Sequence, residues 1–309
     1  MVWSMNAVAE ATYRDRIQRA IDYTEENLTR GVSLKGAADA ACWSAYHFMR
    51  TFHAITGSTY AEYVRDRRLE VAAYRLVFTR DRILDIALQV GYETQEAFTR
   101  AFKRSYGSSP GQYRIADAYR VRQPTITVDG TAGPRAPNDA GATMEPTIRE
   151  LGPITIIGAE LRTRGDGSNF KEIPAFWERF MAEKTFSKIP AKTNPDISFG
   201  LCTNADEETG DFSYVIGCEV PAGTNAPDGL GEFVIPHKQY LVFTASGPFE
   251  GGAYTAEIQR VWKYVYGEWF PASNKWERDD GPDFEVYDEA RCTDSAGECD
   301  IYIPVRSKE

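Results

Sequence analysis

The sequence predicts two domains: an all-α domain in which a long helix joins two helix-turn-helix units, and an α+β domain with an antiparallel sheet. Residues 34–52 and 83–102 each contain a short apolar helix, a tight turn and a second helix with one polar face. After about residue 146, short β-type runs separated by helices replace this pattern. The expected boundaries are 1–120 for the first domain, 121–145 for a linker rich in Gly and Pro, and 146–309 for the second domain.

The first unit begins with an alanine-rich helix over residues 34–41 and turns at Cys42 and Trp43. Ser44 follows, and serine is a favourable N-cap for the next helix. Helical spacing predicts a buried side made of Ala45, Phe48, Phe52 and Ile55. The opposite side is then predicted to carry Tyr46, Met49, Arg50 and His53.

The second unit repeats this order, with an apolar helix over residues 83–90, a turn at Gly91 and an N-cap at Thr94. Phe98 and Phe102, one helical turn apart, are the predicted buried pair. The predicted outer face carries Gln95, Glu96, Thr99, Arg100 and Lys103. Side chains such as Gln, Thr and Arg can form hydrogen bonds with base edges in the major groove of DNA.

Between the units, residues 59–78 contain neither Gly nor Pro and are expected to form one helix. Such a helix is roughly 30 Å long. Successive major-groove faces on one side of B-DNA lie about 34 Å apart. One rigid helix could therefore hold two recognition helices one turn of DNA apart within a single chain.

The residues that carry a family resemblance extend from Ala37 to Arg114. They are Ala37, Ala38, Ser44, Phe48, Arg50, Phe52, Gly57, Arg68, Leu69, Ala72, Ile83, Ile86, Ala87, Gly91, Tyr92, Phe98, Arg100, Phe102, Lys103, Gly107, Pro110, Tyr113 and Arg114. The pattern resembles the DNA-binding domain of the AraC/XylS family of transcription regulators, and most closely the branch that binds DNA as a monomer.

The resemblance implies that double-stranded DNA is a partner and that RNA polymerase is a further candidate partner. The residues expected to contact DNA are Tyr46, Met49, Arg50, Gln95, Glu96, Thr99, Arg100 and Lys103. Glu96 and Ala97 depart from the branch, which often carries other polar side chains there. A carboxylate beside phosphates is unfavourable unless it accepts from a cytosine amino group, so the preferred DNA site is expected to differ from those of the relatives. An ion pair between Arg100 and Glu96 is the alternative to a DNA contact by Arg100.

The net charge of −10 divides unevenly between the two halves. Residues 1–120 hold 17 Lys and Arg against 14 Asp and Glu, a net charge of +3, and the remainder carries −13. The mildly basic half is suited to DNA, whereas the acidic half should be kept away from DNA or attract cations.

No apolar run approaches the roughly 20 residues of a membrane span, and the first residues lack the pattern of a signal peptide. A cytoplasmic protein with no membrane partner is therefore expected. The five cysteines contain no CxxC pair and the chain has three histidines, so no metal site and no cofactor are expected. Cys292 and Cys299 could form a redox pair across a turn, although a reducing compartment disfavours it.

The second half alternates strands and helices in an order that is roughly β-α-β-β repeated, with the helices on one face of the sheet. The expected strands are residues 154–161, 197–203, 212–220, 239–246, 284–287 and 299–305. The expected helices are residues 173–184 and 252–266, the second ending near Gly267.

Motifs in this half carry a second resemblance, over about residues 147–306. They are Phe176, Trp177, Phe199, Gly200, Phe212, Ser213, Tyr214, Gly217, Gly247, Trp262, Glu268, Trp269, Phe284–Tyr287 and Asp300–Val305. These residues resemble the GyrI-like effector-binding domain, which implies a small-molecule effector. The family carries a pocket glutamate at the motif that Glu285 matches.

Strand alternation places Glu285 and Tyr287 on one face and Phe284 and Val286 on the other. The residues expected to bind the ligand are Glu285, Tyr287, Trp262, Tyr214 and Tyr302. A carboxylate in an aromatic-lined cleft favours a cationic or amphipathic organic molecule. The alternative places Glu285 at the surface of an edge strand and the aromatic residues in the core.

A competing hypothesis makes the second half a hydrolase of a small electrophilic molecule, because some GyrI-like domains resemble hydrolases that use a pocket glutamate. Glu285 would then be a general base that activates water. The sequence offers no second acid, no nucleophile with its base and no metal set, so no catalytic residue is assigned. A third hypothesis, a DNA-architectural protein, is disfavoured by the acidic second half.

Overall fold

A computed structural model describes residues 2–29, 31–116 and 144–308 of the chain. Two compact units form, Arg14–Ala132 and the remaining residues, and each is described by itself. The predicted linker, residues 121–145, lies almost wholly outside the described residues, so the predicted domain boundaries stay predictions. None of the described helices is both long enough and apolar enough to cross a membrane.

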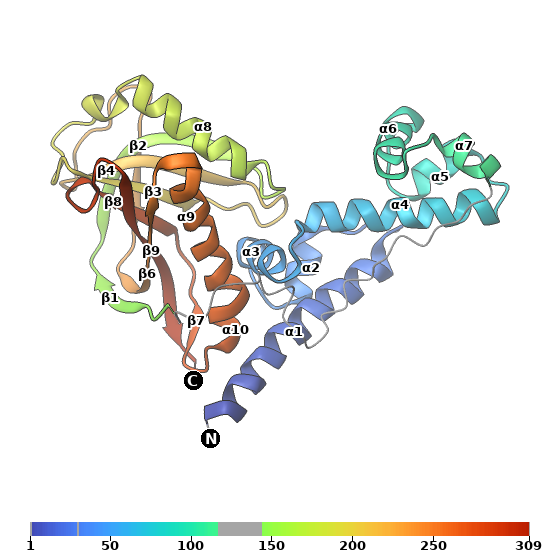
Figure 1. Cartoon of the computed structure of the whole chain (residues 1–309), viewed down its shortest axis with the longest axis horizontal. Helices are drawn as coiled ribbons and strands as arrows, with labels where there is room; N and C mark the ends of the chain where they lie inside the picture. Colours follow the sequence, from blue (N-terminus) through green and yellow to red (C-terminus); the bar gives the residue numbers. More distant parts are fainter. Residues whose placement is uncertain (1, 30, 117–143, 309) are drawn as a thin grey trace. The chain divides into compact units, whose positions relative to one another are not determined.

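The helices before the linker follow the predicted order (Figure 1). They are α1 (Val2–Asn27), α2 (Leu34–Ala40), α3 (Ala45–Thr56), α4 (Tyr60–Phe78), α5 (Ile83–Gln89), α6 (Gln95–Tyr106) and α7 (Pro110–Ala116). Ser44 caps α3 by accepting a hydrogen bond from the His47 amide at 3.3 Å, and Thr94 caps α6 by accepting from the Ala97 amide at 3.1 Å. The two helix-turn-helix units are confirmed.

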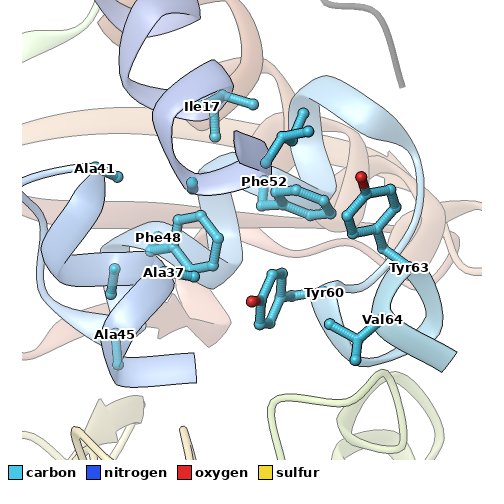
Figure 2. Close-up of a cluster of buried hydrophobic side chains, with 12 residues drawn as sticks. Ile17, Ala37, Ala41, Ala45, Phe48, Phe52, Tyr60, Tyr63 and Val64 are labelled. Atoms are coloured by element: carbon cyan, nitrogen blue, oxygen red, sulfur yellow. The ribbon is translucent and has the colours of Figure 1, made fainter. Parts of the chain in front are cut away.

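Helix α4 contributes to two separate hydrophobic cores. At its beginning, Tyr60 and Tyr63 pack with Phe48 and Phe52 of α3 in the cluster drawn in Figure 2. Toward its end, α4 contributes Leu69, Ala72, Ala73 and Leu76 to a second cluster with the aromatic residues of α6 and α7. The 19 residues of α4 span about 28 Å, so this helix holds the two cores apart.

Residues 2–27 form a helix that none of the sequence patterns above predicts. Near its end, Glu25 accepts hydrogen bonds from Arg67 at 2.8 Å and from the Tyr63 hydroxyl at 2.7 Å, and both donors lie on α4. Partial burial raises the pKa of Glu25, but the hydrogen bonds from Arg67 and Tyr63 outweigh it, so the pKa lies below its ordinary value. These contacts join α1 to the helix that connects the two units.

The second part of the chain forms one antiparallel sheet with nine strands among the described residues. The strands are β1 (Thr147–Leu151), β2 (Ile154–Thr163), β3 (Ile197–Thr203), β4 (Phe212–Val220), β5 (Gly231–Ile235), β6 (Lys238–Pro248), β7 (Trp276–Arg278), β8 (Asp283–Asp288) and β9 (Ala296–Ser307). Their order across the sheet is β1-β6-β9-β8-β3-β4-β2-β5, and β7 pairs with β9. Strands β8 and β3 therefore lie in the middle of the sheet.

Two longer helices complete the β-α-β-β repeat, α8 (Asn169–Ala182) after β2 and α9 (Ala253–Tyr264) after β6. The predicted end of the second helix near Gly267 is wrong. One turn of π-helix, Val265–Trp269, continues α9 into α10 (Phe270–Ala272), so Gly267 lies inside the helical segment.

The sequence patterns locate the central strands well and the outer strands poorly. Strands β3 and β4 have the predicted bounds. Strands β1, β5 and β7 were not predicted, because they are three to five residues long and none carries a clear run of buried residues.

Candidate functional site

The outer face of α6 is open to solvent. Phe98 and Phe102 are fully buried in the second core, as predicted. On the other side of the helix, Gln95, Glu96, Arg100 and Lys103 are exposed and Thr99 is half-buried. Among the described residues, no ion pair joins Glu96 to Arg100. Both side chains therefore stand on the exposed face of α6, opposite Phe98 and Phe102.

The corresponding face of α3 is more covered. Met49 and Arg50 are half-buried, whereas Tyr46 is only 6% exposed. The prediction that the Tyr46 ring points outward beside Arg50 is therefore wrong. The guanidinium of Arg50, one turn later, lies over that ring at 5.0 Å from its centroid.

In the sheet, Glu285 lies on β8 with Gly200 of β3 and Ile301 of β9 directly opposite it. Directly opposed residues of antiparallel strands point to the same face, so these three residues share one face of the sheet. Phe284 pairs with Leu201 and Tyr302 on the other face. The predicted alternation along β8 is confirmed.

Three neutral groups donate hydrogen bonds to the Glu285 carboxylate. The indole Nε1 of Trp262 on α9 donates to Oε1 at 2.8 Å. The hydroxyls of Tyr214 and Tyr287 donate to Oε2 at 2.6 and 3.0 Å. Glu285 is 6% exposed, and no Lys or Arg of the described chain pairs with it. A buried carboxylate thus receives hydrogen bonds but no compensating positive charge.

The two phenols remain donors over the ordinary pH range. Burial, and then the negative charge of Glu285, raises the pKa of Tyr214 well above its ordinary value. The same two causes, in the same order, raise the pKa of Tyr287. Both hydroxyls therefore keep their protons and hold the carboxylate by hydrogen bonds from neutral groups.

Asp283, two residues before Glu285 on the same strand, has a different environment. It is fully buried, accepts a hydrogen bond from the Tyr266 hydroxyl at 2.6 Å and forms an ion pair with Arg278 at 3.0 Å. Asp283 therefore has a cationic partner within the protein, whereas Glu285 has none.

The spacing of two aromatic residues along the helix matches the spacing of Glu285 and Asp283 along β8. Trp262 and Tyr266, four residues apart along the helical segment, stack at 6.3 Å between ring centroids. They bind Glu285 and Asp283, which are two residues apart along β8. Four helical residues rise about 6 Å and two strand residues about 6.6 Å, so one helix face follows one strand face.

Tyr302, predicted as a wall of the ligand site, lies on the opposite face of the sheet. Its ring stacks on Phe284 at 4.7 Å, and its hydroxyl accepts a hydrogen bond from Arg149 at 3.4 Å. The prediction is therefore wrong for Tyr302, because strand alternation places this residue with the core and not with Glu285.

Trp177 on α8 belongs to the site, although the sequence patterns did not assign it. Its indole Nε1 donates to the Tyr214 hydroxyl at 3.0 Å, and its ring meets that of Tyr287 edge-on at 5.0 Å. Phe176 and Phe180 form the buried stripe of α8, so a tryptophan directly beside this stripe was the available signal. Hereafter the Glu285 cluster means Glu285, Tyr214, Tyr287, Trp177 and Trp262.

A cavity of about 570 Å³ opens at the ends of β6 and β9, lined in part by Gly247, Phe249 and Gly297. The Glu285 cluster does not line it. Phe249 and Tyr254 pack edge to face beside Gly297, where a Cβ atom would lie 2.7 Å from Phe249 and 2.9 Å from Tyr254. These two rings therefore pack against β9 at Gly297, and Phe249 also lines the cavity.

The described residues contain no group of three or more His, Cys, Asp and Glu side chains arranged to hold a metal ion. Cys292 and Cys299 are both free thiols, so the redox pair considered above is not formed.

Two protein families match the chain. The family described as integron-associated effector binding protein matches residues 147–305, about half of the chain. A helix-turn-helix domain family of the AraC type matches residues 37–116.

Three known proteins are similar to the whole chain or to part of it. The transcriptional regulator Rob of Salmonella typhimurium is 27% identical over 302 residues, which cover 94% of this chain and 98% of Rob. The transcriptional regulator BrlR of Pseudomonas aeruginosa is 30% identical over 164 residues, 52% of this chain and 56% of BrlR. A solved integron cassette protein of Vibrio cholerae is 20% identical, with a TM-score of 0.36, over 52% of this chain and 96% of that one. The chain belongs to the family of integron-associated effector binding proteins, and it is an AraC-type DNA-binding transcription regulator with a C-terminal effector-binding domain.

Proposed function

We propose that the effector of this regulator is an organic cation poor in hydrogen-bond donors, and that Glu285 binds it. The observation that carries the proposal is the buried Glu285 carboxylate, which accepts three hydrogen bonds from neutral groups and has no cationic partner among the described residues. The domain is proposed to bind this molecule without chemical turnover, and RNA polymerase is the proposed further partner of the regulator.

The hydrogen-bonding capacity of Glu285 supports this class of ligand. A carboxylate has about four lone-pair positions, and the cluster fills three of them. A primary ammonium group brings three donors and would find about one free acceptor position. A quaternary or delocalised cation needs charge and aromatic surface instead, and the cluster supplies both.

A Glu285→Gln variant should bind tetraphenylphosphonium about tenfold to hundredfold more weakly than the wild type, or about 1.4–2.8 kcal/mol, because the variant removes the negative charge that attracts the cation. Titration calorimetry on the full chain measures this difference. Neutral triphenylphosphine oxide is the matched ligand, and its weak binding should not change. Equal affinity of wild type and variant for the cation would contradict the proposal.

The hydrolase alternative is tested separately. Release of 4-nitrophenol from 4-nitrophenyl acetate by the wild type and not by the variant would favour the hydrolase.

For the DNA-binding domain, we propose that Met49, Arg50, Gln95, Glu96, Thr99, Arg100 and Lys103 contact DNA; the buried Tyr46 is left out of this set. The support is strongest for α6, since four of its five proposed residues are exposed on one face. DNA binding also requires the compartment that holds the DNA, which supports the cytoplasmic location expected from the sequence.

An Arg100→Ala variant should lose about 1–3 kcal/mol of binding free energy on the preferred DNA sequence and much less on other sequences, because an arginine that reads a base contributes specificity. Fluorescence anisotropy on a site selected from random duplexes measures both quantities. Lys103→Ala is the matched control, which should weaken binding to all sequences alike and lower the salt dependence by about one ion. Uniform loss with Arg100→Ala would instead mark a phosphate contact.

A further inference from the structure

The hydrogen bonds between Trp177, Tyr214 and Glu285 have a fixed direction. An indole N–H can only donate, so the Tyr214 hydroxyl must accept from Trp177 at 3.0 Å. The hydroxyl has a single proton, and the remaining short contact, 2.6 Å to Oε2 of Glu285, takes it. That distance is typical of a hydroxyl donating to a carboxylate anion. Trp177 therefore determines which way the Tyr214 hydroxyl points.

Gly200 makes this path across the sheet possible. Tyr214 lies on β4 and Glu285 on β8, and β3 separates these strands. A Cβ atom on Gly200 of β3 would lie 2.2 Å from the Tyr214 hydroxyl and 2.8 Å from Oε2 of Glu285. The phenol thus crosses the middle strand at a position where any side chain would block it.

Trp177 also contacts the second phenol that donates to Oε2. Its ring packs edge-on against Tyr287 at 5.0 Å, and the Tyr287 hydroxyl reaches Oε2 at 3.0 Å. Tyr214 is only 2% exposed, so solvent cannot easily replace the indole as the donor to its hydroxyl. One side chain on α8 therefore donates a hydrogen bond to the first phenol and packs against the ring of the second.

We infer that Trp177 is a positioning residue for the effector site, which holds Glu285 as an oriented anion through the hydroxyl of Tyr214. The inference rests on the proposed function, because the oriented anion is the group proposed to bind the cation. It also gives the site two tryptophans with separate tasks. Trp262 of α9 reaches Oε1 directly, whereas Trp177 of α8 reaches Oε2 through a phenol. Both helices are thereby connected to the single carboxylate.

A double-mutant cycle separates positioning from packing. Trp177→Phe should lower the affinity for tetraphenylphosphonium about threefold to tenfold in the wild-type background, as expected for one lost hydrogen bond. In the Tyr214→Phe background the same substitution should have almost no effect, since the hydroxyl that Trp177 orients is gone. Equal losses in both backgrounds would show that Trp177 only fills space and would overturn the inference. Trp276→Phe, which removes an indole outside the cluster, is the control and should leave the affinity unchanged.

A second measurement needs no ligand. The indole ¹H–¹⁵N signal of Trp177, assigned from its loss in Trp177→Phe, should move in Tyr214→Phe and also in Glu285→Gln, although Trp177 has no direct bond to Glu285. A Trp177 signal unchanged in both variants would overturn the inference. If the wild type bound no organic cation while this signal responded, the proposed function would fail and the positioning role of Trp177 would stand.

Discussion

An Asp283→Asn variant is expected to lose about 3–5 kcal/mol of unfolding free energy in the effector-binding domain, because it leaves the buried charge of Arg278 without its partner. Asp283 is fully buried and the Arg278 side chain is 5% exposed, so water cannot replace the lost carboxylate. The Tyr266 hydroxyl, which donates to Asp283, would also lose its anionic acceptor. Urea unfolding followed by the fluorescence of the domain measures the change.

Glu285→Gln is the matched comparison, since it also neutralises one buried carboxylate on the same face of β8. Because Glu285→Gln leaves no buried cation without its ion-pair partner, its effect on stability should be much smaller than that of Asp283→Asn. The effects on tetraphenylphosphonium binding should follow the opposite order, provided that Asp283→Asn is measured where it remains folded. Equal destabilisation by the two variants would contradict the assignment of Asp283 to structure and Glu285 to binding.

A Phe98→Ala variant is expected to destabilise the second helix-turn-helix unit by about 3–5 kcal/mol, since Phe98 is fully buried and packs against Tyr92 and Phe102. The loss should be local, because Phe98 belongs only to the core formed by α5, α6, α7 and the end of α4. Amide hydrogen exchange should show faster exchange in α5 and α6 than in α2 and α3.

Phe48→Ala is the matched variant in the first core, where Phe48 is fully buried. It should accelerate exchange in α2 and α3 and leave α6 largely protected. If each variant accelerated exchange equally in both units, the two cores would unfold as one cooperative unit, and the local effect predicted for Phe98→Ala would be wrong.

Patterns that depend on neighbouring residues could be read from the sequence. Ser44 and Thr94 cap their helices as predicted, because capping requires only contacts within one turn. The alternation of Phe284 and Glu285 likewise assigned them to opposite faces, since a strand has a fixed period of two. The anionic residue of the site could therefore be predicted from the four consecutive residues Phe284–Tyr287.

Features that depend on distant segments could not be read in this way. Tyr302 and Tyr214 are both aromatic, and only the pairings of β9 with β8, β8 with β3 and β3 with β4 place them on opposite faces. Trp177 reaches Glu285 through Tyr214, a residue 37 positions away along the chain, so no local pattern reports the connection. The π turn after α9 lets the helix pass Gly267, which by its type alone indicates a helix end.

Helix α4, which contributes to both cores, sets the rotation of α6 relative to α3. Between Val64, the last α4 residue in the first core, and Leu69, the first in the second, the helix carries only charged side chains, Arg65, Asp66, Arg67 and Arg68. Each residue inserted there would turn α6 by about 100° relative to α3 while moving it only about 1.5 Å. The length of this segment thus fixes the direction in which α6 faces relative to α3. One added residue would turn α6 away from the side that α3 faces.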